Sequence, residues 1–345
     1  MADPVIDRAV ILAGGGGKRL WPWTGPALPK PLLPLGGGGQ SLLSATIDRL
    51  EGLTAPGHLR VQASPSLGVV LVAADRRLGP GALGTEPSPR DTAPAIALAM
   101  RRILDEDPAA VTAILPADQR VADRAAFGRA LERAAAAARA GQLVTLGIAP
   151  SRPATEFGYI ACGGDLAGLD GVRCVERFIE KPNATQVEVF LREDRYLWNG
   201  GIFVWQAETF WRALEEHAPG VAGPVARYHE TGDRDAWNEA ERTSIDYALM
   251  ERATRVASVP LDAGWNDIGG WEAVAELARA GEAGPAALCE IRGPAAADSL
   301  ALEIGDQVAG PLVLVGEYAL LVVRGPNGTL VTPRQRVAEM KPLVP

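Results

Sequence analysis

Short apolar runs alternate with longer amphipathic stretches along most of the chain. Each run is too short for a helix and is bounded by turn-forming residues, as buried β-strands are; the runs cover residues 69–72, 111–115 and 143–148. In the stretches between the runs, apolar residues recur three or four positions apart, which predicts helices with one buried face. These positions are Leu43, Ile47 and Leu50, then Ile96, Ala99, Met100 and Ile103, then Phe127, Leu131, Ala134 and Ala138.

Polar residues and a glycine mark the ends of two of these helices. Asp91 or Thr92 stands where the second helix needs an N-cap, Asp123 stands there for the third, and Gly141 follows the third helix as a C-terminal cap. Strands that alternate with helices in this way predict an α/β fold with a mixed, mostly parallel sheet flanked by helices on both faces.

The pattern changes past about residue 282. The amphipathic stretches end there, and short β-like runs separated by glycines follow at residues 312–315 and 319–323. We therefore expect a large α/β domain over residues 1–282 and a small β-rich domain over residues 283–345, which packs against the main body or forms a homodimer contact.

Composition and charge exclude several classes of protein. The net charge of −8 disfavours nonspecific nucleic-acid binding, which needs a basic face. No apolar run is long enough to span a membrane and no secretory signal is visible, so a cytoplasmic protein without membrane partners is expected. The three cysteines are far apart and unpatterned, which argues against a disulfide framework or a zinc site.

A glycine-rich segment, Leu12 to Pro22, continues from a short apolar run at residues 9–12. Glycines there allow close backbone approach to phosphate oxygens, and the cations beside them could neutralise phosphate charge; an ordinary strand-to-helix turn is the alternative. The segment matches neither the Walker loop nor the dinucleotide fingerprint, and the latter mismatch argues against an oxidoreductase. Five prolines between residues 22 and 34 prevent a long helix. They predict an extended loop that returns Lys30 toward Arg19.

Lysine is rare in this chain and is placed in distinctive settings. Of 34 basic residues only four are lysine, and three of these stand in motif-like contexts at Lys18, Lys30 and Lys181. An ammonium can act as a point charge on a phosphate in a tight site, unlike the planar guanidinium of arginine.

Taken in order, these motifs resemble the sugar-nucleotide pyrophosphorylases, which are nucleotidyltransferases with a Rossmann-like (GT-A-like) fold. The resemblance covers nearly the whole chain and is closest to members that transfer a guanylyl group from GTP to mannose 1-phosphate, giving GDP-mannose and pyrophosphate. It rests on the glycine loop and on residues 29–30, 41–43, 49–50, 86–87, 90–95, 115–118, 157–160, 178–182, 196–199, 244–247 and 261–267. The resemblance implies a small β-helix-like tail that can mediate dimers.

The resemblance also implies roles for particular residues. Asp118 and Asp267 follow strand-like runs, at the ends where open α/β sheets bind ligands, and would hold Mg²⁺. The catalytic set would be Arg19, Lys30, Asp118, Lys181 and Asp267. Nucleotide binding would fall to Gly14, Gly15, Gly17, Lys18, Glu86, Arg90 and Thr92. Sugar-phosphate binding would fall to Gly158, Glu180, Lys181 and Asn199.

Three departures from the family pattern leave the substrates open. Asp91 stands where the family usually has asparagine, Gln119 replaces a histidine, and Gly200 replaces a serine. The same chemistry with another sugar or base, giving GDP-heptose or a nucleoside diphosphate glucose, therefore remains an alternative. A non-catalytic nucleotide-sugar sensor is a second alternative, from another functional class.

Overall fold

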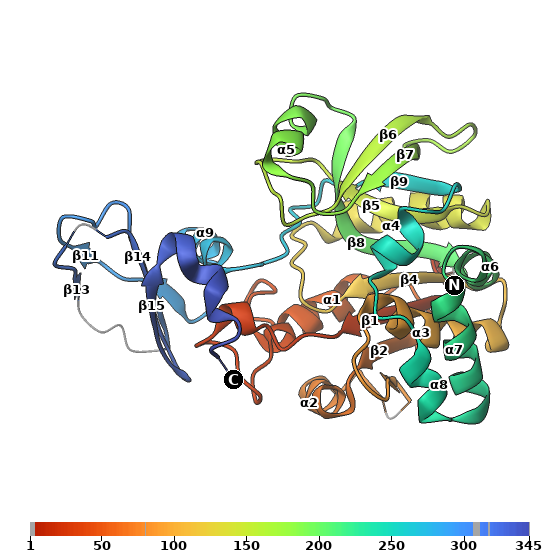
Figure 1. Ribbon diagram of the computed structural model, residues 1–345, viewed down its shortest axis with the longest axis horizontal. Coiled ribbons are helices and arrows are strands. Elements are labelled where there is room, and N and C mark those ends of the chain that lie inside the picture. The colour runs from red at the N-terminus through yellow and green to blue at the C-terminus, as the bar shows by residue number, and fades with distance from the viewer. Residues whose placement is uncertain (1–3, 80, 306–310, 317, 345) are drawn as a thin grey trace. The chain divides into compact units, whose positions relative to one another are not determined.

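A computed structural model describes residues 4–79, 81–305, 311–316 and 318–344 (Figure 1). Its contacts divide the chain into two compact units. The first unit comprises Met1–Gly14, Arg49–Pro116 and Val121–Trp265, and the second comprises Gly15–Asp48, Ala117–Arg120 and Asn266–Pro345. Among the described residues, none of the helices combines the length and the apolar character that crossing a membrane requires.

The first unit is built on one sheet with the strand order β3-β2-β1-β4-β8-β5-β9-β7-β6. β1 to β4 run parallel, and β5 and β9 form a second parallel pair. β8 lies antiparallel between β4 and β5, and β7 lies antiparallel between β9 and β6. The strands are β1 (Arg8–Ala13), β2 (Leu59–Ala63), β3 (Leu83–Thr85), β4 (Val111–Pro116), β5 (Leu143–Ile148), β6 (Tyr159–Asp165), β7 (Arg173–Ile179), β8 (Tyr196–Gln206) and β9 (Val256–Pro260). The predicted mixed α/β sheet is confirmed, with both parallel and antiparallel pairings among its described strands.

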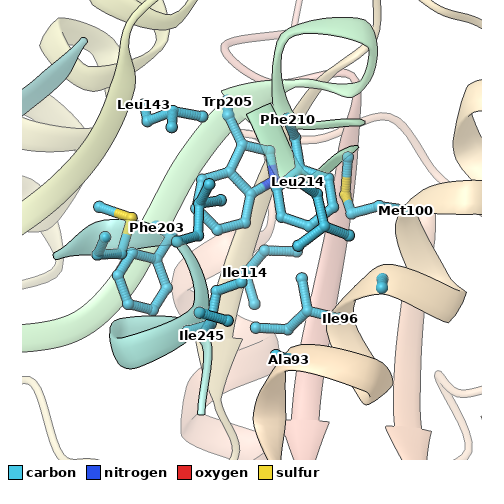
Figure 2. Close-up of a cluster of buried hydrophobic side chains, with 14 of the residues drawn as sticks. Ala93, Ile96, Met100, Ile114, Leu143, Phe203, Trp205, Phe210, Leu214 and Ile245 are labelled. Carbon is cyan, nitrogen blue, oxygen red and sulfur yellow. The ribbon is translucent and has the colours of Figure 1, made fainter. Parts of the chain in front are cut away.

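Helices cover this sheet on both faces. A continuous apolar cluster joins β4 and β8 to α3, α6 and α7, and Figure 2 shows Trp205 and Phe203 of β8 meeting Ile96, Met100, Phe210 and Leu214 from the helices. α4 packs on β4, β5, β8 and β9 through buried residues that are outside this cluster. The helices of the first unit include α2 (Pro65–Ala74), α3 (Thr92–Glu106), α4 (Arg124–Arg139), α5 (Ala184–Phe190), α6 (Ala207–His217), α7 (Pro219–Thr231), α8 (Arg234–Glu239) and the π-helix η3 (Asp246–Met250).

The predicted helix boundaries are confirmed by their caps. Asp123 accepts a hydrogen bond from the Ala126 amide at 2.9 Å and so caps α4. Asp91 accepts from the Thr92 amide at 2.7 Å and caps α3, with φ 70° and ψ −174°, a backbone conformation that favours glycine. Gly141 has a φ of 78° after α4, as a C-terminal cap requires.

One predicted strand is wrong. Residues 69–72 lie within the helix α2, where Val69 is 65% exposed rather than buried. A short apolar run has no periodicity that separates a buried strand from a helix. The informative signal is upstream: Ser64 takes the N-cap position and Pro65 the first helical position.

The second unit has its own apolar core and sheet. Its strands are β10 (Ala286–Leu288), β12 (Leu300–Ile304), β14 (Leu320–Gly325) and β15 (Gly328–Pro333) in one sheet, with β11 (Ile291–Arg292) and β13 (Leu312–Val313) paired separately. Its helical segments include η1 (Lys18–Leu20), η2 (Lys30–Leu32), α9 (Trp271–Arg279) and η4 (Arg334–Met340). The predicted β-rich character of the C-terminal segment is confirmed, although β13 is shorter than the run at 312–315.

The compact units do not coincide with the expected segments 1–282 and 283–345. Leu20, Trp23 and Leu33 from the N-terminal loop share one buried cluster with Trp271 of α9 and Leu302 of β12. Burial of these large side chains against one another stabilises the second unit by the hydrophobic effect, so the glycine-rich and proline-rich loops belong to the unit that carries the C-terminal strands.

Candidate active site

The backbone of the glycine-rich loop packs against the Lys30 side chain of the proline-rich loop. A Cβ on Gly17 would stand 2.4 Å from Cβ of Lys30, and Gly17 has a φ of 76°, so both space and conformation require glycine there. The Lys30 amide donates to the Gly16 carbonyl at 3.4 Å. The proline-rich segment therefore returns Lys30 to the glycine loop, as its sequence predicts.

Lys30 is the centre of a polar cluster in the second unit. Its side chain is only 11% exposed, and Nζ donates to Oδ2 of Asp118 at 2.9 Å and to the main-chain oxygen of Asp267 at 2.6 Å. A nearly buried ammonium must be paired in this way to offset its lost hydration. Three residues separated by up to 237 positions in sequence thus meet at one cation.

Backbone pairing holds the two aspartates at this position. Asp118 lies in the loop after β4 and Asp267 in the loop after β9. The Arg120 amide donates to the Asn266 carbonyl at 2.8 Å, and the Asn266 amide donates back to Arg120 at 2.9 Å. The loops that carry Asp118 and Asp267 are therefore fixed to each other by a reciprocal bridge.

The carboxylate oxygens in this cluster are the kind of ligand that a hard divalent cation prefers. The Asp118 side chain is 37% exposed, so its carboxylate remains open to a ligand. A Cβ on Gly269 would stand 2.6 Å from Oδ2 of Asp267, so glycine leaves room for that carboxylate. Carboxylate oxygens from one or two side chains, completed by substrate phosphates, are the ligands that Mg²⁺ commonly takes. The carboxylates of Asp118 and Asp267 are therefore chemically suited to hold a divalent cation.

The other loop residues of the second unit face open space. Arg19 is exposed, and within the part of the chain that the structure describes its guanidinium has no hydrogen-bond or ion-pair partner. A Cβ on Gly15 or Gly16 would meet no described heavy atom within 4 Å. Lys18 instead donates to the Val344 carbonyl at 3.3 Å. The guanidinium of Arg19 is thus available to a ligand, whereas the Lys18 ammonium contacts the end of the chain.

The predicted sugar-phosphate residues come together in the first unit. A Cβ on Gly158 would stand 2.5 Å from Oε2 of Glu180 and 3.5 Å from Cβ of Asn199. The Lys181 ammonium lies 2.9 Å from Oε1 of Glu180, and this hydrogen bond raises the pKa of Lys181. The Glu180 side chain is 10% exposed and that of Lys181 is 60% exposed. Lys181 therefore presents a permanent positive charge to solvent beside a fixed carboxylate.

Asp246 also lies in this cluster, although its sequence motif predicted no role for it. Asn199 donates from Nδ2 to Oδ1 of Asp246 at 2.8 Å, and Asn199 Oδ1 accepts from the Thr145 hydroxyl at 2.9 Å. Burial raises the pKa of Asp246 to about 7, and the charge of Glu180 contributes to the rise. Asp246 belongs to the sequence motif at residues 244–247, but its contact with Asn199 becomes visible only in the fold.

The predicted nucleotide-binding residues of the first unit differ in whether their polar side-chain atoms already have hydrogen-bond partners. Arg90 donates from Nη1 to the Ala240 carbonyl at 2.7 Å, and the Thr92 hydroxyl accepts from the Ile245 amide at 2.9 Å, so both hold the segment before η3. Glu86 is 6% exposed, and its Oε2 has no hydrogen-bond partner among the described residues. Burial raises the pKa of Glu86 to about 7. A buried acceptor without a donor is costly unless a ligand supplies one. Gly14 ends the segment of this unit that contains β1.

The mixed α/β sheet and the glycine loop agree with the nucleotidyltransferase class that the sequence motifs predict. The chain belongs to the nucleotidyl transferase family, whose sequence profile matches residues 8–283.

Two named relatives align with 97% of this chain. The xanthan biosynthesis protein XanB of Xanthomonas campestris pv. campestris (strain B100) is 35% identical over 346 residues, which cover 97% of this chain and 72% of that protein. The mannose-1-phosphate guanylyltransferase of Escherichia coli (strain K12) is 31% identical over 352 residues, with coverage of 97% and 72%.

A solved structure has the same fold over 98% of this chain. The crystal structure described as mannose-1-phosphate geranyltransferase from Thermus thermophilus superposes with a TM-score of 0.79 at 31% identity, covering 98% of both chains.

Proposed function

We propose that this chain transfers a guanylyl group from GTP to mannose 1-phosphate, giving GDP-mannose and pyrophosphate. The observation that carries the proposal is the cluster in which Lys30 binds both Asp118 and Asp267. Relatives that bear the name mannose-1-phosphate guanylyltransferase support the choice of substrates.

The reaction requires positioning and charge stabilisation rather than a protein nucleophile. An oxygen of the sugar phosphate attacks the α-phosphorus of GTP in line, and the bond from that phosphorus to the β-phosphate oxygen breaks, so no covalent enzyme intermediate forms. Arg19 and Lys30 would stabilise negative charge on the α-phosphoryl group and on the leaving pyrophosphate. Mg²⁺ held by Asp118 and Asp267 would act as a Lewis acid and neutralise phosphate charge.

The remaining candidate residues would each bind a different part of the two substrates. Lys181 would bind the phosphate of mannose 1-phosphate, and Glu180 and Asn199 would bind sugar hydroxyls, with Gly158 allowing close approach. The main chain at Gly14, Gly15 and Gly17, together with Lys18, would lie along the triphosphate. Arg90 and Thr92 would act on the base side by holding the segment before η3.

Glu86 would select guanine. The Watson–Crick edge of guanine offers two neighbouring N–H donors, at N1 and N2, and the buried Oε2 of Glu86 is an acceptor that lacks a donor among the described residues. Glu86→Gln is therefore expected to lower kcat/KM for GTP by about 10²-fold, the effect of losing a charge-assisted contact at a buried site. Its catalysis with UTP should change little, so steady-state kinetics with both nucleotides measures the loss of discrimination.

The same residue predicts a pH dependence. Because the pKa of Glu86 is raised to about 7, its carboxylate becomes protonated as the pH falls through 7, and KM for GTP should then rise. KM for GTP in Glu86→Gln should lack this step. A step of equal size in both proteins would assign the titration to another group.

A matrix of bases and sugars tests the proposal. Purified protein with Mg²⁺ is offered GTP, UTP, dTTP or ATP with mannose 1-phosphate, glucose 1-phosphate or a heptose 1-phosphate. We expect the highest kcat/KM for GTP with mannose 1-phosphate, with one GDP-mannose per pyrophosphate. A maximum at another pair would select the alternative products, GDP-heptose or a nucleoside diphosphate glucose. Absence of pyrophosphate from every pair would favour a non-catalytic sensor.

We also propose that the C-terminal strands form a short β-helix-like piece that joins two copies of the chain in the cytoplasm. The parallel pairing of β12 with β14 and of β11 with β13 supports the first part. Val313 and Tyr318 support the second part, because they are 63% and 78% exposed. Sedimentation should give twice the chain mass for the native protein and less for Val313→Asp.

A further inference from the structure

The π-helix η3 places two carboxylates on one side of a single turn. The Glu251 amide donates to the Asp246 carbonyl at 2.9 Å, which is the i to i+5 hydrogen bond of a π-turn. This bond stacks Glu251 over Asp246. An α-turn would stack the buried Met250 there instead, so the extra residue in the turn is what aligns the two acids.

Each of these acids holds one residue of the sugar-phosphate cluster. Oδ1 of Asp246 accepts from the side-chain amide of Asn199 at 2.8 Å, and Oε1 of Glu251 accepts from the main-chain amide of Glu180 at 2.9 Å. Asn199 Oδ1 also accepts from Thr145 and from the Gly201 amide at 3.1 Å. With its oxygen saturated and one amide hydrogen bound by Asp246, Asn199 can rotate only by breaking three hydrogen bonds.

The other end of this segment is anchored on α3. The Ile245 amide donates to the Thr92 hydroxyl at 2.9 Å, and the Ala93 amide donates to the Thr243 carbonyl at 3.1 Å. These bonds fix the residues immediately before η3. The segment that carries Asp246 and Glu251 is therefore anchored to α3 by hydrogen bonds.

We infer that Asp246 and Glu251 are positioning residues for the sugar phosphate, acting through Asn199 and Glu180. This inference rests on the proposed function, in which Asn199 and Glu180 contact the sugar. Neither acid needs to touch the substrate. Asp246 has the larger effect because it is half-buried, whereas Glu251 is exposed and its hydrogen bond competes with water.

Several charged and titratable groups surround Asp246, and its protonation state affects the stability of the fold. Glu180 and Lys181 face it from the end of β7, and Tyr247 and Glu251 flank it on η3 and the following turn. Because burial raises the pKa of Asp246 to about 7, its ionised form destabilises the folded state, and stability decreases as the pH rises toward 7. Asp246→Asn removes this buried charge and keeps an oxygen acceptor, so the variant should fold at least as well as the native protein above pH 7.

Separate KM values for the two substrates test the inference. Asp246→Ala should raise KM for mannose 1-phosphate by about tenfold or more, the effect of losing a hydrogen bond to a charged group, and leave KM for GTP within about twofold. Asp246→Asn should restore most of this loss. Glu251→Ala should raise KM for mannose 1-phosphate by about threefold. Arg242→Ala, an exposed residue of the same segment, is the matched control and should change neither KM.

Three kinetic results would overturn the inference. They are an unchanged KM for mannose 1-phosphate in Asp246→Ala, equal losses for both substrates that Asp246→Asn does not restore, and an unchanged KM in Glu251→Ala.

A crystal structure of unliganded Asp246→Ala tests the same claim without turnover. We expect the Asn199 amide to leave the position that it holds between Thr145 and Gly201. An Asn199 that stays in place would overturn the inference even if the enzyme were active on other substrates. Failure of the native protein to turn over GTP with mannose 1-phosphate would instead count against the proposed function.

Discussion

Asp118→Asn is expected to lower kcat for GDP-mannose formation by roughly 10³-fold, comparable to removing a main electrostatic group from a phosphoryl-transfer site. The amide keeps an oxygen that can accept from Lys30 Nζ, which lies 2.9 Å from Oδ2 in the native protein, so the packing around Lys30 should persist. The anionic charge is lost, and with it a ligand suited to Mg²⁺. The melting temperature should fall, because the nearly buried Lys30 ammonium loses its charged partner, but the rate of pyrophosphate release should fall far more than this loss of stability explains.

Asp262→Asn is the matched control for this substitution. Asp262 is an exposed aspartate in the loop after β9, and it lies outside the cluster around Lys30. Its variant should keep the native kcat. A native rate in Asp118→Asn, with retained Mg²⁺ dependence, would remove Asp118 from the catalytic set.

Arg19→Ala is expected to lower kcat/KM by roughly 10²- to 10³-fold without changing stability. The Arg19 side chain is exposed, and no described residue pairs with it, so its removal should cost the fold less than about 0.5 kcal/mol. A large kinetic effect without a stability effect is what a substrate-binding guanidinium predicts. Arg19→Lys should recover only part of the rate, because an ammonium cannot form the planar bidentate contact.

Arg76→Ala serves as the control for charge removal alone. Arg76 is another exposed arginine, placed after α2 in the first unit. Its variant should retain the native kcat/KM. Equal losses in both variants would indicate a nonspecific effect of net charge, and a lowered melting temperature in Arg19→Ala would indicate a structural role.

Local signals in the sequence predicted the helices that begin at caps and the strands that are wholly buried. Asp123 and Gly141 bracket α4 because capping depends on one or two residues and on nothing distant. The run at 69–72 failed because its apolar residues fit either element, and the exposure of Val69 depends on which part of the fold covers α2.

The cluster around Lys30 could be predicted in part because open α/β sheets bind ligands at the carboxyl ends of their strands. That rule brought Asp118 and Asp267 to one edge, and the prolines returned Lys30 to the glycine loop. The atoms that meet could not be predicted: Lys30 binds the carboxylate of Asp118 but the main-chain oxygen of Asp267. Such a choice depends on side-chain packing and on loop pairing between Arg120 and Asn266.

Asp246 shows a second limit of sequence reasoning. Its motif was recognised, yet its contact with Asn199 spans 47 residues, and its alignment with Glu251 involves a π-turn. A single extra residue in a helical turn leaves no periodic signature in a short segment. The role of Asp246 therefore emerges only when η3 and β8 are seen together.

A crystal structure of the protein with GDP-mannose and Mn²⁺, in which anomalous scattering locates the metal, is the most direct test of the proposed metal site. We expect a metal peak coordinated by the carboxylates of Asp118 and Asp267, with the α-phosphate beside it and Arg19 and Lys30 directed at the phosphates. A metal and α-phosphate bound away from Asp118 and Asp267, with Arg19 in solvent, would contradict this proposal.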